Sequence, residues 1–552
     1  MDKRFFFERN LLALSRTDPA LCSRLSAAET TQNRYKFLES RSGEIVPALV
    51  TAEGGARPLH SLVDPQKEGR RFISASEQEG FLIFLGLGGG FAAAAALERE
   101  DVHRVLVIDY DINGVAELFC SREYIRILSD PRFRLLVDSP EELIRGYILD
   151  NYQPVFSGGI RMLPLRPRLE GDPVKFSRAG AAVESAIEAI SADYSVQAYF
   201  GTRWFSNIIR NIFRAAEAYS PLGPVRKAAV CAAGPSLDIQ LSRLLEKRER
   251  LFVFAVDTSL PSLLQRGLEP DAVVSIDCQH ISYYHFMNGL PRGASLFLDL
   301  ASPPLVASRS ERPYFFSGGH PLSHYISRYW RPLPPVDTSG GNVTYAALSL
   351  ADKLGAGEIE LYGADFSYPL GRTYARGTYI YPYFENRQNR FSPLEGLFSS
   401  FLYRDTSLKR VEKETSWYYE TWALTMYRRK VEEQKLRAAL FPIPGLGPPL
   451  AAREKTKEPG ELSLFAAGKA SMGAGEFLDT YRRDIRALPL LREGPEAYLK
   501  KLNPREKQIL TTLIPEAAAI KRCRPELNTA ELLEAVQAYC LKEIDRVLQS
   551  KG

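Results

Sequence analysis

The stretch LFVFAVDTSLPSLLQRGLEPDAVVSIDCQ, residues 251 to 279, holds two short apolar runs separated by a helical segment. The first run, Leu251 to Val256, ends in Asp257-Thr258-Ser259, and the second, Ala272 to Ile276, ends in Asp277-Cys278-Gln279. Short apolar strands that alternate with helices are typical of a mostly parallel sheet covered on both faces. This stretch therefore predicts an α/β domain.

Further apolar runs extend the predicted sheet on both sides of this stretch. They are Ala228 to Ala232, Leu296 to Leu300, Tyr314 to Phe316 and Glu358 to Tyr362. A helix is predicted from Asn342 to Leu354, because its apolar residues share one face and Gly355 follows it. Together these elements predict a central α/β nucleotide-binding domain over residues 225–394.

The N-terminal part of the chain predicts a Rossmann-like unit over residues 1–155. An apolar strand, Phe81 to Leu85, precedes the glycine turn 86–90 and an alanine-rich helix, and a second strand, Arg104 to Ile108, ends in Asp109. A third strand is predicted at Phe133 to Val137. Residues 156–224 are predicted to form a helical connector.

The C-terminal part, residues 395–552, predicts a helical domain. The segment YYETWALTMYRRKVEEQKLRAAL, 418 to 440, predicts one long helix that ends at the Pro/Gly-rich residues 441–449, and the charged stretch up to about residue 462 predicts a loop. The final helix is predicted after a cap at Asn528, with one apolar stripe. That stripe consists of Leu533, Val536, Cys540, Ile544 and Val547.

Composition narrows the classes of function. The chain has 71 basic and 66 acidic residues, interleaved along its length, and this balance argues against nucleic-acid binding. Its six cysteines form no CxxC pair, which favours free thiols in a reducing compartment. The sequence contains no signal-peptide core and no apolar run long enough to span a membrane. We expect a cytoplasmic protein without a membrane span.

Polar and glycine-rich turns follow several of the predicted strands. Since the carboxyl ends of parallel strands meet at one edge of a sheet, we expect these turns to bind a nucleotide-activated donor there. Some of the same residues could instead be helix caps or ordinary turns. The candidate donor-binding residues are Gly234, Pro235, Ser236, Asp257, Thr258, Asp277, Gln279, Thr338, Ser339, Gly340, Asn342, Gly363 and Asp365.

Two tyrosines, Tyr368 and Tyr374, follow the last predicted strand of the central domain. Phenolic hydroxyls are suited to donate hydrogen bonds to a leaving phosphate. The other interpretation is that both tyrosines are structural. We predict that they are catalytic.

Three segments, in this order and spacing, resemble the motility-associated-factor (Maf) family of flagellin glycosyltransferases. They are GPSLD at 234–238, FAVDTSLPSLLQRGLEPDAVVSIDCQ at 254–279 and GNVTYAALSLADKLGAGEIELYGADFSYPLGRTYARG at 341–377. LHSLVDPQKEGRRF at 59–72, the glycine turn unit at 81–109 and WFSNIIRNI at 204–212 extend the resemblance upstream. It implies transfer of a nonulosonic acid of the pseudaminic or legionaminic type from its CMP conjugate to flagellin Ser or Thr, in support of flagellar assembly and motility.

The run from TSG at 338–340 through EIELYGADF is also similar to bacterial CMP-sialic-acid sialyltransferases. The similarity implies that Thr338, Ser339 and Gly340 hold the donor carboxylate or phosphate, that Asp257 lies near the nucleotide, and that Tyr368 and Tyr374 contact the departing phosphate. Two features depart from that pattern.

The first departure is Ala233, which stands where those enzymes have an asparagine before GPSL, so recognition of the base does not transfer. The second concerns the catalytic histidine, which follows the YGADF-like strand in those enzymes, whereas the last histidine here is His324. His320 and His324 are therefore candidates for the catalytic base on general grounds only.

No metal site is predicted. CMP leaves with a single phosphate, so a helix N-terminus and two tyrosines could stabilise its charge, and Mg²⁺ is possible but not expected. Asp109-Tyr110-Asp111 has the D-x-D spacing of metal-dependent glycosyltransferases, yet its place after a Rossmann-like strand equally suits an acid that binds ribose.

Two other functions fit the same motifs. The central motifs are shared with archaeal-type 6-hydroxymethylpterin diphosphokinases, which would make the chain an ATP-dependent enzyme. A non-catalytic flagellin-binding protein would fit the helical C-terminal region. The added N-terminal and C-terminal regions favour sugar transfer to a large partner over a small pterin substrate. The sequence leaves the exact sugar, the acceptor residues and the oligomeric state open.

Overall fold

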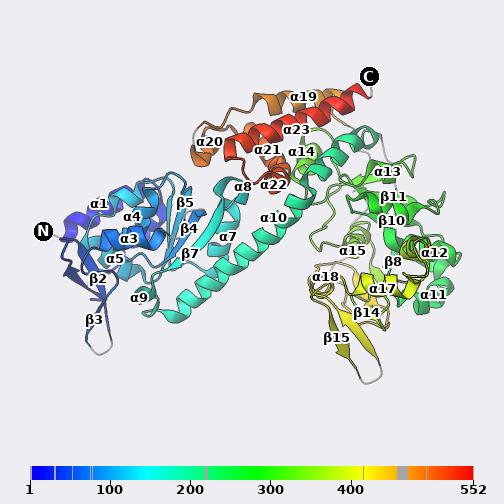
Figure 1. Cartoon of the computed structure of the whole chain (residues 1–552), viewed down its shortest axis with the longest axis horizontal. Helices are drawn as coiled ribbons and strands as arrows, with labels where there is room; N and C mark the ends of the chain where they lie inside the picture. Colours follow the sequence, from blue (N-terminus) through cyan, green and yellow to red (C-terminus); the bar gives the residue numbers. More distant parts are fainter. Residues whose placement is uncertain are drawn as a thin grey trace. The chain divides into compact units, whose positions relative to one another are not determined.

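The computed structural model describes residues 3–29, 33–51, 54–74, 76, 79–217, 222–413, 416–456, 470–492 and 494–550. The chain forms two compact units, each of which contains a parallel sheet (Figure 1). The N-terminal unit comprises Met1–Tyr199, Pro489–Lys507 and Ile514–Val536, and the central unit comprises Phe200–Leu488, Gln508–Leu513 and Gln537–Gly552. The α/β class predicted from the sequence is confirmed.

A four-stranded parallel sheet forms the middle of the N-terminal unit. Its strands run in the order β6 (Phe133–Val137), β5 (Arg104–Asp109), β4 (Glu79–Leu85) and β7 (Gly159–Pro164). The first three confirm the predicted strands. Strand β7 was not predicted, because its half-buried residues lack the apolar run that marks the others.

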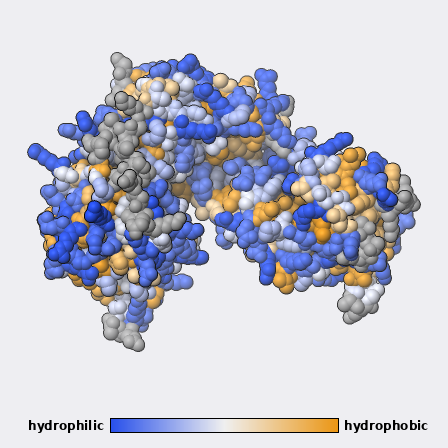
Figure 2. Space-filling model, turned by 180° about the vertical axis from the view of Figure 1, so that it is seen from behind, coloured by the Kyte–Doolittle hydropathy of each residue, from blue (hydrophilic) through white to orange (hydrophobic). Residues whose placement is uncertain are grey.

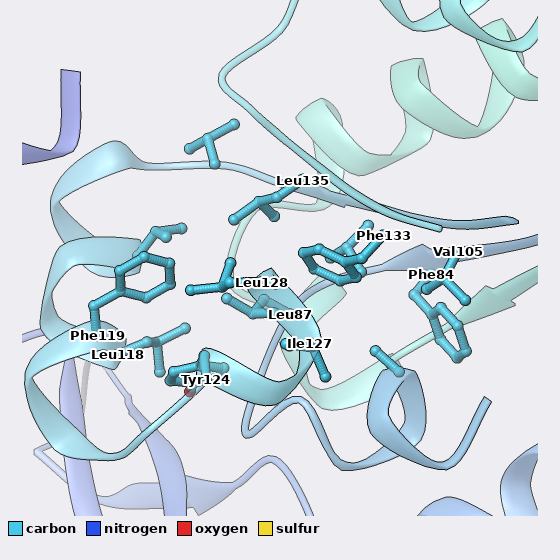
Figure 3. Close-up of a cluster of buried hydrophobic side chains, with 14 of the residues drawn as sticks. Phe84, Leu87, Val105, Leu118, Phe119, Tyr124, Ile127, Leu128, Phe133 and Leu135 are labelled. Atoms are coloured by element: carbon cyan, nitrogen blue, oxygen red, sulfur yellow. The ribbon is translucent and has the colours of Figure 1, made fainter. Parts of the chain in front are cut away.

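Helices cover both faces of this sheet, because successive side chains of each strand point to opposite sides. Leu82 and Phe84 pack with α4 (Phe91–Leu97), α5 (Ile112–Ser121) and α6 (Ile125–Leu128), in the cluster that Figure 3 shows. Ile83 and Leu85 pack on the other face with α7 (Glu141–Asn151) and α10 (Pro173–Ala215). The predicted helical connector corresponds mainly to α10.

The remaining elements of the N-terminal unit surround this core. An antiparallel sheet consists of β1 (Tyr35–Glu39), β2 (Ile45–Val50) and β3 (Ala56–Pro58). The helices are α1 (Lys3–Ser15), α2 (Pro19–Ser26), α3 (Pro65–Ile73), α8 (Pro154–Ser157), α9 (Arg166–Leu169), α20 (Pro495–Lys501) and α22 (Ile514–Cys523). Helices α10, α21 (Pro504–Thr512) and α23 (Thr529–Gln549) contribute residues to both units.

The central unit contains a seven-stranded sheet in which every neighbouring pair is parallel. The order is β12 (Tyr314–Phe316), β11 (Ser295–Asp299), β10 (Ala272–Ser275), β9 (Phe252–Val256), β8 (Lys227–Cys231), β13 (Glu358–Tyr362) and β17 (Ala439–Pro442). All six strands predicted for the central domain are confirmed. Helix α15 (Val343–Lys353), also predicted, packs against β8, β9 and β10.

Further helices connect and follow the strands of the central unit. They are α11 (Leu237–Glu246), η1 (Arg248–Arg250), η2 (Asp257–Ser259), α12 (Leu260–Gln265), η3 (His280–Phe286), α13 (Pro304–Ala307), α14 (Pro321–Tyr329), α16 (Ile380–Glu385), α17 (Leu394–Leu402) and α19 (Ala474–Ala487). Helix α23 begins after Asn528, whose side chain accepts from the Glu531 amide at 3.0 Å, as predicted. All five residues of its predicted apolar stripe are buried.

The single helix predicted over 418–440 is wrong. The structure instead has β16 (Trp417–Glu420), α18 (Trp422–Glu433) and β17. Thr421 starts α18 by accepting from the Leu424 amide at 3.2 Å, and the apolar residues after α18 pair with β13. Strand β16 forms a small antiparallel sheet with β14 (Tyr368–Pro369) and β15 (Lys409–Glu412). Residues 395–552 are therefore not wholly helical, and the loop predicted up to residue 462 lies partly outside the described residues.

The outer side of β17 is partly occupied by the chain itself. The Leu440 amide donates to the Arg453 carbonyl, and the Arg453 amide donates back to the Leu440 carbonyl, both at 2.9 Å. The Arg453 guanidinium also donates to the Val431 carbonyl at 3.0 Å. These bonds hold the segment after β17 against the last strand of the sheet.

Two asparagines of α10 fix the loops that follow β10 and β11. Asn207 Nδ2 donates to the carbonyls of Cys278 at 3.0 Å and Ala301 at 2.8 Å. Asn211 Nδ2 donates to the carbonyls of Leu300 at 2.9 Å and Ser302 at 2.7 Å. Residues four apart lie on one helix face, so one turn of α10 supplies both contacts.

The surface is mixed in character. On the face drawn in Figure 2, apolar residues occur in small groups among hydrophilic ones. Among the residues that the structure describes, every helix is too short or too polar to span a bilayer.

We predict that Asn211→Ala lowers the free energy of unfolding of the central unit by about 1–3 kcal/mol, because two buried carbonyls lose their donor. All four tryptophans, Trp204, Trp330, Trp417 and Trp422, belong to the central unit, so their fluorescence during denaturant titration reports on it alone. Asn389→Ala, at an exposed turn, is the control. Equal loss in both variants would contradict the role given to Asn211.

Candidate functional site

The strand order of the central unit places a switch point between β8 and β13. The chain moves outward from β8 through β9 to β12 on one side, and continues through β13 and β17 on the other. In open α/β sheets, ligands bind outside the carboxyl ends of the strands at such a point. The turn after β8 contains Gly234 and Ser236, and the turn after β13 contains Gly363 and Asp365.

The structure brings these predicted residues together. The Gly234 amide donates to the Gly363 carbonyl at 2.8 Å, and the Ser236 amide donates to Asp365 Oδ2 at 2.8 Å. A Cβ atom on Gly234 would lie 2.3 Å from Asp365 Oδ2, so only glycine fits there. Pro235 is buried between them. The two turns form one closely packed group.

Asp365 is at the centre of this group, and its carboxylate accepts hydrogen bonds from other residues of the protein. Besides Ser236, it accepts from the Gly447 amide at 3.0 Å, and the Ser236 hydroxyl accepts from the Leu446 amide at 2.6 Å. Burial raises the pKa of Asp365, while the bonds from Ser236 and Gly447 oppose that rise. Asp365 and Ser236 thus latch the loop after β17 onto the switch point.

A second group of predicted residues lies at the ends of β9 and β10. Asp257 is buried, accepts from the Ser275 hydroxyl at 2.6 Å, and accepts from the Thr258 amide at 2.6 Å. Asp277 accepts from the Gln279 amide at 2.9 Å. Burial, followed by the negative charge of Asp257, raises the pKa of Asp277. The carboxyl ends of β9 and β10 therefore carry two carboxylates, Asp257 and Asp277, that are near enough for one charge to affect the other.

The loop 337–342 holds the predicted TSG residues. Asp337 accepts from the Ser339 amide at 2.9 Å and the Tyr345 hydroxyl at 2.8 Å. Asn342 caps α15 by accepting from the Tyr345 amide at 2.9 Å. A Cβ atom on Gly340 would lie 2.1 Å from the Tyr345 ring, so a side chain is excluded there.

Thr338 lies beside the ends of β11 and β12. A Cβ atom built on Gly318 would meet Thr338 Oγ1 at 3.1 Å and Asp299 Oδ2 at 2.2 Å, so both oxygens border the same glycine. Burial raises the pKa of Asp299 to about 6, although the Ala301 and Gly318 amides donate to its carboxylate. Asp299 was not predicted as a site residue, because it ends a strand without a glycine or hydroxyl motif.

Tyr368 and Tyr374 are carried by the segment after β13. The Ala375 amide donates to the Ala233 carbonyl at 2.9 Å, which anchors Tyr374 next to the end of β8. Burial is the main cause that raises the pKa of both tyrosines, and the positive charge of Arg404 opposes it. The negative charge of Asp257 also contributes, as the smallest cause, to the raised pKa of Tyr374.

Three residues that sequence reasoning missed complete this arrangement: His285, Tyr379 and Arg404. The Tyr379 ring is 6.4 Å from that of Tyr374 and 4.6 Å from that of His285, which it meets nearly at right angles. The Arg404 guanidinium lies 3.8 Å above the Phe401 ring, which is 6.3 Å from Tyr374. A row of rings thus connects Arg404 with His285. The nearest signal in the sequence was the aromatic richness of residues 374–403.

The two histidines predicted as bases have other surroundings. His320 is buried, its Nδ1 accepts from the Leu322 amide at 3.1 Å, and its ring packs edge-on against Trp204 at 5.3 Å. Burial lowers the pKa of His320 to about 3, which makes it a weak proton acceptor. His324 is exposed on α14.

The D-x-D motif of the N-terminal unit is held by internal contacts. Asp109 is fully buried, accepts from the Leu87 amide at 2.7 Å, and pairs with the buried Arg168 at 2.8 Å. Asp111 caps α5. The Gly89 amide of the glycine turn donates to His60 Nε2 at 2.9 Å. Asp109, Asp111 and the Gly89 amide, which would contact a dinucleotide in a Rossmann domain, are therefore engaged by contacts within the protein.

Metal ligands do not gather in the part of the chain that the structure describes, where no group of three or more His, Cys, Asp or Glu side chains could hold an ion. Asp257, Asp277 and Asp299 are instead each engaged by backbone amides.

The chain is similar to one family model and to one solved structure. A family model described as 6-hydroxymethylpterin diphosphokinase MptE-like matches residues 205–371, which hold β8 to β13 and the switch point. A solved structure described as MAf glycosyltransferase from Magnetospirillum magneticum AMB-1 aligns with a TM-score of 0.60 over 99% of this chain and 96% of that chain, at 14% identity. The resemblance to the Maf family is thus confirmed at the level of the fold.

Curated relatives come from Treponema pallidum (strain Nichols), where they are described as uncharacterized proteins. One is 35% identical over 153 residues, which is 27% of this chain and 54% of that protein. Another is 33% identical over 136 residues, which is 24% of this chain and 64% of that protein. The chain thus spans little more than half the length of these relatives.

We predict that Asp299→Asn gains stability relative to the parent as pH rises. Because the folded pKa, about 6, exceeds the unfolded value, the stability that protonated Asp299 contributes is complete below the unfolded pKa and is lost as pH rises through about 6. Two pKa units correspond to about 3 kcal/mol as an upper bound. Tryptophan-monitored denaturation between pH about 4 and about 7 measures the change. A difference that is independent of pH would contradict the burial of Asp299.

Proposed function

We propose that the chain is a glycosyltransferase that moves a nonulosonic acid of the pseudaminic or legionaminic type from CMP to a Ser or Thr hydroxyl of flagellin, in support of flagellar assembly and motility. The observation that carries the proposal is the row of rings that connects Arg404 with His285 through Tyr374 and Tyr379, beside the carboxyl ends of the strands that precede Asp257 and Asp277. The fold shared with a structure described as a MAf glycosyltransferase supports the reaction class.

The phenols and the arginine suit a departing phosphate. Tyr368 and Tyr374 can donate hydrogen bonds to it, and Arg404, stacked on the Phe401 ring that lies beside Tyr374, supplies a positive charge nearby. Donors preorganised where charge develops stabilise the transition state more than the ground state. In this proposal CMP leaves without a metal ion, and Mg²⁺ is not required for the chemical step.

The donor would lie across the strand ends. Asp257, Thr258, Asp277 and Gln279 offer oxygen and amide groups to the ribose and base at β9 and β10. Thr338 and Ser339, on the loop before α15, offer hydroxyls to the sugar carboxylate. Asp365 and Ser236 hold the turns that border the nucleotide, and their contribution to donor binding is through position.

An ATP-dependent diphosphokinase is the second candidate, and the match of residues 205–371 to the MptE-like model favours it. Both candidates use the same strand edge, so the nucleotide discriminates between them. A flagellin-binding protein without activity is the third and would give no transfer to any acceptor.

We predict that CMP stabilises the folded chain and that ATP does not. A ligand at a hundredfold excess over its dissociation constant adds about 2.7 kcal/mol when it binds only the native state. Thermal unfolding in the presence of CMP, CDP, ATP or GTP, followed by tryptophan fluorescence, measures the effect on the central unit. Selective stabilisation by ATP would favour the diphosphokinase instead.

We predict that Tyr374→Phe lowers turnover by about two to three orders of magnitude, because removing one donor to the developing charge costs about 2.7–4 kcal/mol. Stabilisation by CMP should persist. Intact-mass measurement of flagellin, incubated with CMP-pseudaminic or CMP-legionaminic acid, gives the rate. Tyr403→Phe, whose hydroxyl meets that of Tyr419 at 2.8 Å, is the matched control. Parental turnover in Tyr374→Phe would make this tyrosine structural.

A further inference from the structure

His285 occupies a distinctive place at the carboxyl edge of the central sheet. It lies in η3, directly after the β10 turn that carries Asp277, and only 7% of the residue is exposed. Its ring meets Tyr379 at 4.6 Å and 81°. Its buried Nδ1 has no hydrogen-bond partner among the described residues. A buried imidazole with a free ring nitrogen, in contact with a phenol and eight residues after a carboxylate at a strand end, suits proton transfer.

The other five histidines lack this combination. His60 and His103 belong to the N-terminal unit, and His60 Nε2 already accepts from the Gly89 amide. His280 and His324 are exposed. His320 has its Nδ1 engaged with Leu322 and a pKa lowered by burial to about 3. All six histidines of the chain lie in the described ranges.

We propose that His285 is the base that activates the acceptor hydroxyl, with Asp277 and Tyr379 as positioning residues. This inference rests on the proposed function. The acceptor O–H bond breaks as an imidazole nitrogen of His285 takes the proton, and the hydroxyl oxygen forms a bond to the anomeric carbon of the donor sugar. The bond from that carbon to the phosphate oxygen breaks, and CMP leaves with the electron pair beside Tyr374.

The surroundings of His285 fit this role. Asp277 can stabilise the imidazolium that forms, and the charge of His285 in turn opposes the effect of burial on the pKa of Asp277. Tyr379 restricts the imidazole ring through its perpendicular contact. Asp257, Tyr374 and Arg404 lie around Tyr379, and Tyr383 contacts Tyr379 at 6.5 Å between ring centroids. On the other side, Arg309 after α13 is engaged with Tyr283 of η3.

The first experiment compares His285→Gln with His280→Gln, a substitution at the exposed end of the same short helix. We expect His285→Gln to lower the rate of sugar transfer to flagellin by about a hundredfold or more, the usual effect of losing a general base. CMP stabilisation should be unchanged in both variants, and His280→Gln should transfer at the parental rate. Transfer by His285→Gln at the parental rate would overturn the assignment.

A second measurement covers the case in which His285→Gln fails to fold. His285 must be neutral to accept a proton, so the parental transfer rate should fall toward low pH. In Asp277→Asn the lost negative charge makes protonation of His285 less favourable, and the acidic limb should move to lower pH. An unmoved limb would overturn the pairing. A parental enzyme that transfers no CMP-activated nonulosonic acid would overturn the proposed function itself, independently of either variant.

Discussion

The hydrogen bonds between Asp365 and Ser236 are the contacts on which the candidate site depends. They join the turns after β8 and β13, which are neighbours in the sheet but 129 residues apart in the chain. Through Gly447 and Leu446 the same pair also holds the loop after β17. A buried carboxylate is tolerated only when its oxygens are satisfied, and here backbone amides and a hydroxyl satisfy them. The edge where a donor would bind therefore has a fixed geometry before any ligand arrives.

Local pattern was sufficient to predict most of the fold. The six central strands are short apolar runs bounded by turn residues, and Asn342 and Gly355 mark both ends of α15. Strand β17 escaped prediction because its run, Ala439–Pro442, is short, ends in proline and follows a helix without a clear break. Only pairing with β13 makes it a strand, and such pairing is invisible in a single sequence.

For the candidate site, the sequence indicated the carboxyl edge of the central sheet, but it did not indicate which residues contact one another there. Gly234, Asp257, Asp277 and Asp365 were proposed as donor-binding residues because they follow strands, and the structure places each of them at a strand end. The engagement of Asp365 by Gly447 is a contact across 82 residues, and no local pattern predicts it. His285 was missed for a similar reason, since a histidine in HISYYHF is unremarkable until folding places it against Tyr379. Conversely, His320 was a candidate base on general grounds only, and its burial lowers its pKa to about 3, which makes it a weak proton acceptor.

The short bridge between Leu440 and Arg453 bears on how the molecule behaves among its own copies. An outermost strand presents unpaired amides and carbonyls, onto which the strand of another chain can add, and this is a route to aggregation. On β17 the amide and carbonyl of Leu440 are already bonded to Arg453 at 2.9 Å, and Pro442 has no amide to offer. The chain thus caps the outer edge of its own sheet, and a neighbouring molecule finds few free backbone groups there to extend it.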